Sequence, residues 1–203
     1  MSLIMLYVTN MLGYMLVALP FYIIGRIVFV KRMRSQVNLW RELVLGMFVL
    51  YMVGLASQTI IPQWSAGILA ETGEFYFDVY LRSAQVNLIP FRTLNAYFFH
   101  TYTYVDNWNS VSLVNIIGNS FLFSPIGFLM PCLWKRWQSL KRILWIALGV
   151  TCTIEFIQLF IGRSTDIDDV ILNTVGVMLG YGLFAIVHAK WDAKLKRAGY
   201  SPY

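Results

Sequence analysis

The sequence predicts an all-α integral membrane protein, a bundle of five transmembrane helices. The first observation is composition: 58% of the 203 residues are hydrophobic and only 13% are charged, whereas a soluble domain has roughly 25% charged residues. The second is distribution, because the charges gather in short islands between long apolar runs, and a soluble fold spreads polar residues along every element. We therefore expect the islands to be loops and the apolar runs to be helices in lipid.

Five apolar runs are long enough to cross a bilayer, since about 20 apolar residues in a helix span roughly 30 Å of hydrocarbon. The runs are Leu3–Val30, Leu43–Ile61, Val111–Leu133, Ile143–Ile161 and Val170–Ala189. We expect the last helix to begin at Asp166. No basic residue precedes the first run and the run is long, so we interpret it as a retained helix rather than a secretion signal. Residues 1–203 are expected to form one membrane domain.

The basic residues predict the orientation, because loops rich in Lys and Arg stay in the cytoplasm. They form three islands, after the first, third and fifth runs: Lys31, Arg32, Arg34 and Arg41; Lys135, Arg136, Lys141 and Arg142; Lys190, Lys194, Lys196 and Arg197. The N-terminus is therefore expected outside and the C-terminus in the cytoplasm. These islands also account for the formal net charge of +6, so nucleic acid is not an expected partner.

The segment 62–110, between the second and third runs, is too long for an ordinary connection and is rich in aromatic residues. Such side chains prefer the headgroup zone. We expect this segment to lie on or dip into the outer interface, with short amphipathic helices, where it is placed to roof a site. Within it, Asn87–Arg92 resembles a turn into a re-entrant piece, because Pro90 biases Ile89 away from helix.

Glu155 is the most informative residue. It lies about 9 Å below the outer end of its helix, where a carboxylate costs up to about 3 kcal/mol unless it has partners. Gln158 follows three residues later, on the same face. An ionisable group inside the bilayer is a functional candidate, so we favour the functional interpretation for Glu155.

The neighbouring helices carry polar groups at the same depth. The connection from Gly162 to Thr165 is tight, so the fourth and fifth helices are expected to be antiparallel neighbours, with Glu155 opposite Asn173. The third and fifth helices then add a polar pair and a stripe at three- and four-residue spacing: Asn115 and Asn119; Asp166, Asp169, Asn173, Gly176 and Gly180. Together these residues predict a polar pocket that opens outward, with Arg163 in reach.

Structural alternatives remain for several of these residues. Amides in membrane helices often only tie helices together, at about 0.6 kcal/mol per bond on average, so Asn115 and Asn119 are open to both interpretations. For Asp168 we favour a structural role, a capping box with Thr165 at the start of the last helix.

No metal or cofactor is predicted. The acidic residues Asp166, Asp168, Asp169 and Glu155 offer the oxygen ligands that Mg²⁺ or Ca²⁺ takes, but their spacing matches no EF-hand loop. A zinc site is not expected, because the two histidines, His100 and His188, are far apart. Cys132 and Cys152 are interpreted as apolar packing.

The polar segments together resemble the VanZ-like family. The resemblance rests on the run from Asn115 to Gly127, on Glu155-Phe-Ile-Gln158, on Arg163 to Gly176, and on Asn87 to Arg92. It covers about the last two-thirds of the chain. The residues that match the motifs are Asn87, Pro90, Phe91, Asn119, Pro125, Gly127, Glu155, Gln158, Arg163, Asp166, Asp169, Asn173 and Gly176. The resemblance implies a bacterial cytoplasmic-membrane protein, in a family whose founding member is associated with resistance to teicoplanin and related lipoglycopeptides, and it supplies no reaction.

Three functions are compatible with these observations. The first is a non-enzymatic protein that binds a lipid-linked ligand, either a cell-wall lipid intermediate or a lipoglycopeptide, among the membrane lipids of the outer leaflet. The second is an enzyme acting on a lipid or polyprenyl phosphate, with Glu155 or Asp169 as general base and Arg163 with Arg92 on the head group. The third is a lipid transporter or flippase, which the absence of repeats disfavours. The oligomeric state stays open.

Overall fold

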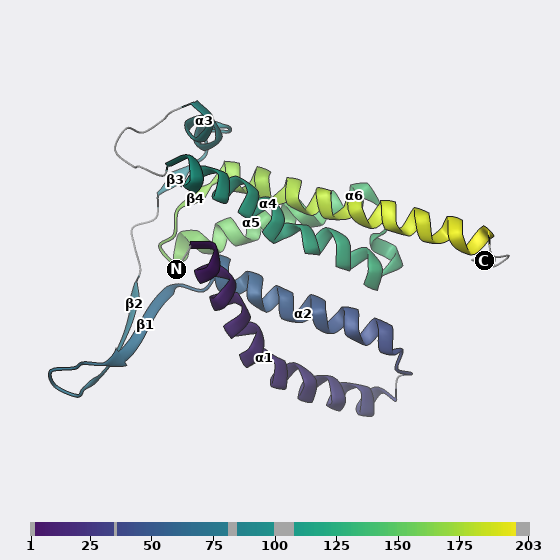
Figure 1. Ribbon diagram of the computed structural model, residues 1–203, viewed down its shortest axis with the longest axis horizontal. Helices are drawn as coiled ribbons and strands as arrows, with labels where there is room; N and C mark the ends of the chain where they lie inside the picture. The colour runs from purple at the N-terminus through teal and green to yellow at the C-terminus, as the bar shows by residue number, and fades with distance from the viewer. Residues whose placement is uncertain (1–2, 35, 81–84, 100–107, 198–203) are drawn as a thin grey trace.

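The computed structural model describes residues 3–34, 36–80, 85–99 and 108–197 (Figure 1). Five helices in this part of the chain are long and apolar enough to cross a membrane: α1 (Leu3–Met33), α2 (Leu39–Thr59), α4 (Trp108–Leu133), α5 (Leu140–Phe160) and α6 (Ile167–Arg197). The prediction of a five-span helical membrane protein is therefore confirmed.

The helix ends extend beyond several predicted boundaries. α2 begins four residues before the predicted Leu43, where the Asn38 side chain accepts a hydrogen bond from the Arg41 N–H (3.2 Å) and caps the helix. α6 continues to Arg197, past the predicted end at Ala189. Both differences arise because the apolar run marks the hydrocarbon core, while a helix continues through the headgroup zone with charged residues on it.

The two ends of the bundle differ in structure (Figure 1). One end, called the hairpin end, holds the start of α1, the α5–α6 turn and the small elements β1 (Gln63–Ile68), β2 (Phe75–Tyr80), β3 (Val86–Asn87), α3 (Arg92–Phe99) and β4 (Thr165–Asp166). The other, called the basic end, holds the α1–α2 connection, the 3₁₀ turn η1 (Lys135–Trp137) and the end of α6. The three basic islands of the sequence thus lie at one end.

The closest helix pair is α4 and α6, which meet backbone to backbone. A Cβ atom added to Gly176 or Gly180 would collide with the carbonyl oxygens of Ser120 and Ser124 on α4, and one added to Gly127 would collide with the carbonyl of Val177. Helices in lipid gain little from hydrophobic burial, so close backbone approach supplies the van der Waals contact that holds them. Around this pair the core is formed by Leu55, Phe123, Ile126, Ile143, Ala147 and Val177.

Helix α1 packs against α2. Near the basic end, Arg26 makes a two-pronged ion pair with Glu42, with N···O distances of 2.5 and 2.6 Å. The sequence offered no partner for Arg26, because the two residues are 16 positions apart on different helices. Along the contact, Gly46 lies against the ring of Tyr22.

The aromatic segment 62–110 differs from its prediction. Its described residues contain one short helix, α3, but their first part is an antiparallel hairpin, β1–β2, which projects from the bundle (Figure 1). The strand register places every apolar side chain of the pair on one face and the polar ones on the other. The exposed apolar face consists of Trp64, Ala66, Ile68, Phe75, Phe77 and Val79.

Two contacts define the base of this hairpin. The indole N–H of Trp64 donates to the Tyr14 hydroxyl of α1 at 2.7 Å, and the Trp64 and Phe77 rings stack at 5.8 Å. The base of the β1–β2 hairpin is thus attached to α1 at the hairpin end of the bundle. Its location at a membrane interface stays a prediction, and His100 of the same segment lies outside the described residues.

Candidate functional site

Polar side chains from α4, α5, β4 and α6 meet at the hairpin end of the bundle. We call this group the polar cluster, and it consists of Asn119, Glu155, Asp166, Asp169 and Asn173. The tight turn at Gly162, which has φ +71°, makes α5 and α6 antiparallel neighbours. The turn therefore brings the carboxylate of α5 beside the first turns of α6, and α4 packs against α6.

Glu155 is buried inside the protein and does not face lipid. Its side chain is 5% exposed, and its Oε2 accepts a hydrogen bond from the Asp166 N–H at 3.0 Å. The Glu155 main-chain carbonyl accepts from the Thr165 hydroxyl at 3.1 Å. A carboxylate beside the N-terminus of α6 is stabilised by the unpaired N–H groups and the helix dipole there, which offsets part of the cost of placing it in the bilayer.

Asp169 and Asn173 lie one turn apart on the face of α6 that meets the other helices. Asp169 accepts a hydrogen bond from the Asn119 amide of α4 at 2.9 Å. Asn173 is 4% exposed, and its side-chain oxygen has no hydrogen-bond partner among the described residues. An unpaired buried acceptor costs about 1–3 kcal/mol, so this oxygen is the atom of the cluster with the most to gain from a donor on a ligand.

Asp166 joins the cluster to the segment before α4. Strands β3 and β4 pair in parallel with Asn87 opposite Asp166, and the Asn87 amide donates to Asp166 Oδ1 at 3.0 Å. The Thr93 hydroxyl donates to the other carboxylate oxygen. Asp166 also accepts from the Asp168 N–H at 2.9 Å and so caps α6. Its oxygens are therefore engaged in holding the fold.

The predicted capping box of Thr165 with Asp168 is wrong. The Thr165 hydroxyl bonds to the Glu155 carbonyl instead, and Asp166 provides the cap. Asp168 is 1% exposed and accepts hydrogen bonds from the main-chain N–H groups of three residues of another element, namely Phe91 (2.5 Å), Thr93 (2.8 Å) and Leu94 (3.0 Å). Asp168 therefore caps α3, a helix more than 70 residues away in the sequence.

The turn from Asn87 to Phe91, which precedes α3, has the geometry that this cap requires. Phe91 adopts φ +63°, a left-handed conformation that follows Pro90 and directs its N–H to the Asp168 carboxylate. The Asn87 side chain reinforces the turn, because its oxygen accepts a hydrogen bond from the Ile89 N–H at 3.3 Å. Asn87, Pro90 and Phe91 thus contribute to a docked turn rather than to the cluster itself.

Three other candidates occupy different positions. Gln158 faces α2, where its amide donates to the Thr59 carbonyl at 2.9 Å. Arg163 lies half-buried in the α5–α6 turn, near enough to Glu155 and Asp169 to act on both electrostatically. Arg92 is exposed at the start of α3, apart from the cluster, and the Asn115 side chain lies outside the described part of the structure.

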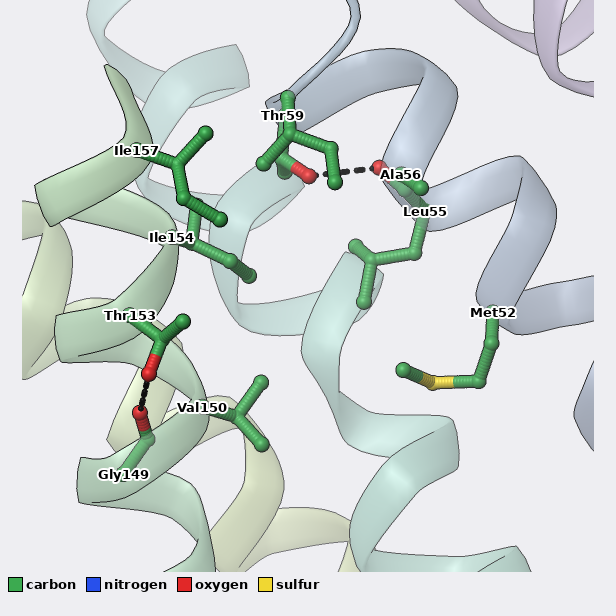
Figure 2. A pocket seen from close by; sticks show the side chains of 10 residues that line it. Met52, Leu55, Ala56, Thr59, Gly149, Val150, Thr153, Ile154 and Ile157 are labelled. Carbon is green, nitrogen blue, oxygen red and sulfur yellow. Dashed lines mark hydrogen bonds between the residues drawn. The ribbon is translucent and has the colours of Figure 1, made fainter. Parts of the chain in front are cut away.

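The hollow beside this region is apolar rather than polar. Figure 2 shows a groove of about 420 Å³ between α2 and α5, lined on one side by Met52, Leu55 and Ala56 and on the other by Gly149, Val150 and Ile154. It adjoins the polar cluster at the α5 main chain, because Ile154 lines the groove and its neighbour Glu155 belongs to the cluster. This groove was not predicted from the sequence. The small residues Ala56 and Gly149 indicate it only when α2 and α5 are already known to face each other.

The chemistry of the cluster is that of a hydrogen-bond acceptor. Besides Asp166, whose oxygens are already engaged, it presents the carboxylates of Glu155 and Asp169 and the unpaired amide oxygen of Asn173. Among the described residues Arg163 is the nearby cation. Sugar hydroxyls, amides and ammonium groups are the donors that such a set recognises. Within the described ranges no three His, Cys, Asp or Glu side chains are placed to hold a metal ion.

The same residues are covered by a match to a known family. The family model described as VanZ/LLP1 matches residues 48–188, which include most of α2 and the whole polar cluster. The chain belongs to the VanZ/LLP1 family. A curated relative, Protein VanZ of Enterococcus faecium, is 35% identical over 80 residues, which are 39% of this chain and 49% of VanZ. The chain thus spans about half the length of that relative, and no solved structure matches it.

The VanZ/LLP1 match leaves α1 outside its limits. It includes the hairpin, the docked turn before α3, the α4–α6 glycine contact and both walls of the apolar groove. Apart from the start of α1, the features at the hairpin end therefore fall within the family region.

Proposed function

We propose that this protein binds a lipid-linked ligand of the bacterial cell envelope at the polar cluster, and thereby contributes to resistance to teicoplanin-type lipoglycopeptides or to envelope homeostasis. The observation that carries the proposal is the Asn173 oxygen, which is buried and unpaired among the described residues, one helical turn from Asp169 on α6. Membership of the VanZ/LLP1 family supports the choice of the envelope as the setting.

The energetics favour binding over a purely structural role for this cluster. The carboxylates of Glu155 and Asp169 lie within electrostatic range of each other and repel, and in the described part of the chain Arg163 is the one cation near them. Tying helices together needs none of this, because the glycine contact and the Asn119–Asp169 bond already hold α4 to α6. A ligand rich in hydrogen-bond donors would offset the cost of both the repulsion and the unpaired oxygen.

The mutational test uses Glu155→Gln and Asn173→Ala. Gln keeps the shape of Glu155 and removes its charge, and Asn173→Ala removes the unpaired oxygen. We expect each to weaken ligand binding by about fivefold or more, the factor that corresponds to about 1 kcal/mol for one hydrogen bond. Teicoplanin resistance of a susceptible bacterial host, measured as the minimal inhibitory concentration, should fall to that of the empty vector at equal expression.

Glu42→Gln is the matched control, because Glu42 is also a carboxylate with a defined partner on a membrane helix but lies near the basic end. It should leave resistance unchanged. If the wild-type protein confers no resistance, or if Glu155→Gln and Asn173→Ala both keep it, the proposal fails. A covalently altered lipid product, formed by the purified wild-type protein, would replace binding with the enzymatic alternative.

The proposal places the hairpin end outside the cell and the basic end in the cytoplasm, as the basic islands predict. Both native cysteines, Cys132 and Cys152, are exposed on the helices and are first replaced by Ala. A membrane-impermeant thiol reagent on intact cells should then label Glu71→Cys, at the hairpin tip, and not Lys31→Cys, at the basic end. The reverse pattern would place the cluster in the inner leaflet and end the proposal.

A further inference from the structure

We infer that the groove between α2 and α5 holds the single hydrocarbon chain of the ligand whose head group the polar cluster binds. This inference rests on the proposed function, since it names the second half of the same ligand. The occupant of the groove is a chain attached to that head group. A bulk lipid chain or a second copy of the protein in the groove would contradict this assignment.

The size of the groove matches a chain and excludes a helix. Its lining on α2 runs from Met52 to Ile60 and on α5 from Gly149 to Ile157, which is about 12 Å of helix in each case. The volume of about 420 Å³, spread over that length, gives a cross-section of roughly 35 Å². A helix about 10 Å across has a cross-section of roughly 80 Å², so the groove fits a hydrocarbon chain more closely than it fits a whole helix.

The lining offers an occupant no hydrogen bond from its hydroxyls. Thr59 and Thr153 are the polar side chains of the groove, and each donates to a carbonyl of its own helix, Leu55 at 2.8 Å and Gly149 at 2.6 Å (Figure 2). The remaining lining residues are apolar or glycine. An occupant is therefore held by van der Waals contact, which selects an alkyl or prenyl chain.

The groove and the polar cluster are arranged as chain site and head-group site. The lining covers the half of α2 and α5 nearest the hairpin end, which is also the level of Glu155. Ile154 and Glu155 are adjacent residues that face the groove and the cluster respectively. The Gln158–Thr59 bond lies between the two, so the chain enters the groove from the lipid side while the head group stays at the α5–α6 turn.

Gly149 supplies a variant that fills the groove without disturbing the fold. A Cβ atom added there meets no atom within 4 Å, so Gly149→Leu extends into the open space of the groove. A helical glycine replaced by leucine also gains helix propensity. Gly182→Leu is the matched control, because an added Cβ at Gly182 likewise meets nothing and α6 does not line the groove. Ala56→Leu fills the groove from the opposite wall.

The experiment uses the full-length protein in lipid nanodiscs and two photoactivatable probes. One is teicoplanin with a diazirine at the end of its acyl chain, and the other is a polyprenyl phosphate with a diazirine on its chain. Labelled peptides are located by mass spectrometry. We expect one of the two probes to label the segments 52–60 and 149–157, and Gly149→Leu and Ala56→Leu to reduce this labelling several-fold while Gly182→Leu does not. The probe that labels identifies the source of the chain.

Other results would overturn the inference. Labelling spread over the exposed surface of α1, or no labelling of the groove by either probe, would mean that the chain stays in bulk lipid. Crosslinks between two copies across Gly149 would assign the groove to an interface. In each case the resistance of Glu155→Gln still decides the proposed function separately, because that variant leaves the groove lining unchanged.

Discussion

Gly180→Ala should separate α4 from α6 and lower the free energy of unfolding by about 3 kcal/mol, the upper part of the range for overpacked cores. The added methyl group would overlap the main-chain carbonyl of Ser124. A flexible side chain can move away from such a clash, whereas a carbonyl inside a helix moves only with the helix. The contact also has no hydrophobic drive in lipid to restore it once the backbones separate.

The control for this prediction is Gly182→Ala, two residues along the same helix. Its added Cβ meets no atom within 4 Å, and alanine is the better helix former by about 1 kcal/mol. Thermal unfolding of the purified proteins in detergent can be monitored by size-exclusion chromatography. It should show a large loss of stability for Gly180→Ala and none for Gly182→Ala. Equal midpoints for the two variants would show that α4 and α6 do not meet as described.

Asp168→Ala should release α3 from the bundle. The Asp168 carboxylate is the acceptor for three main-chain N–H groups, and hydrogen bonds to a charged group contribute about 1.5–3 kcal/mol each. Even with water replacing part of this, a loss of about 3 kcal/mol is expected, which corresponds to about a hundredfold in the opening equilibrium of the docked turn.

Hydrogen exchange measures this opening directly. Peptides covering residues 91–96 should exchange about a hundredfold faster in Asp168→Ala, while the α4–α6 contact keeps its protection. Asp192→Ala is the control on the same helix, because its pair with His188 is largely exposed at the basic end. Unchanged exchange in Asp168→Ala would mean that α3 is held by contacts other than this carboxylate.

The glycine contact and the Asp168 cap hold different elements around the polar cluster. The glycine contact sets the distance between α4 and α6, which positions Asn119 beside Asp169. The Asp168 cap holds the segment before α4 at the hairpin end, next to Asp166. The positions of the residues in the polar cluster therefore depend on these main-chain contacts.

The sequence alone determined the number of spans, the approximate position of each helix and the family. Long apolar runs separated by charged islands leave few alternatives in lipid, because only helices satisfy the backbone there. Local spacing also determined which residues share a helix face, as for Asp169, Asn173, Gly176 and Gly180. These properties depend on neighbours within a few residues, so the sequence contains them directly.

Only the tertiary structure decided which face meets which partner. The sequence predicts that Asp168 caps its own helix, but in the structure it caps α3. Gln158 is predicted on the same face as Glu155, but its amide donates to a carbonyl of α2. The Arg26–Glu42 pair, the hairpin register and the apolar groove likewise join residues that are distant in sequence or on separate helices. The physical reason is that helix periodicity defines the direction of a side chain around its own axis, whereas the partner depends on how separate helices and strands pack together.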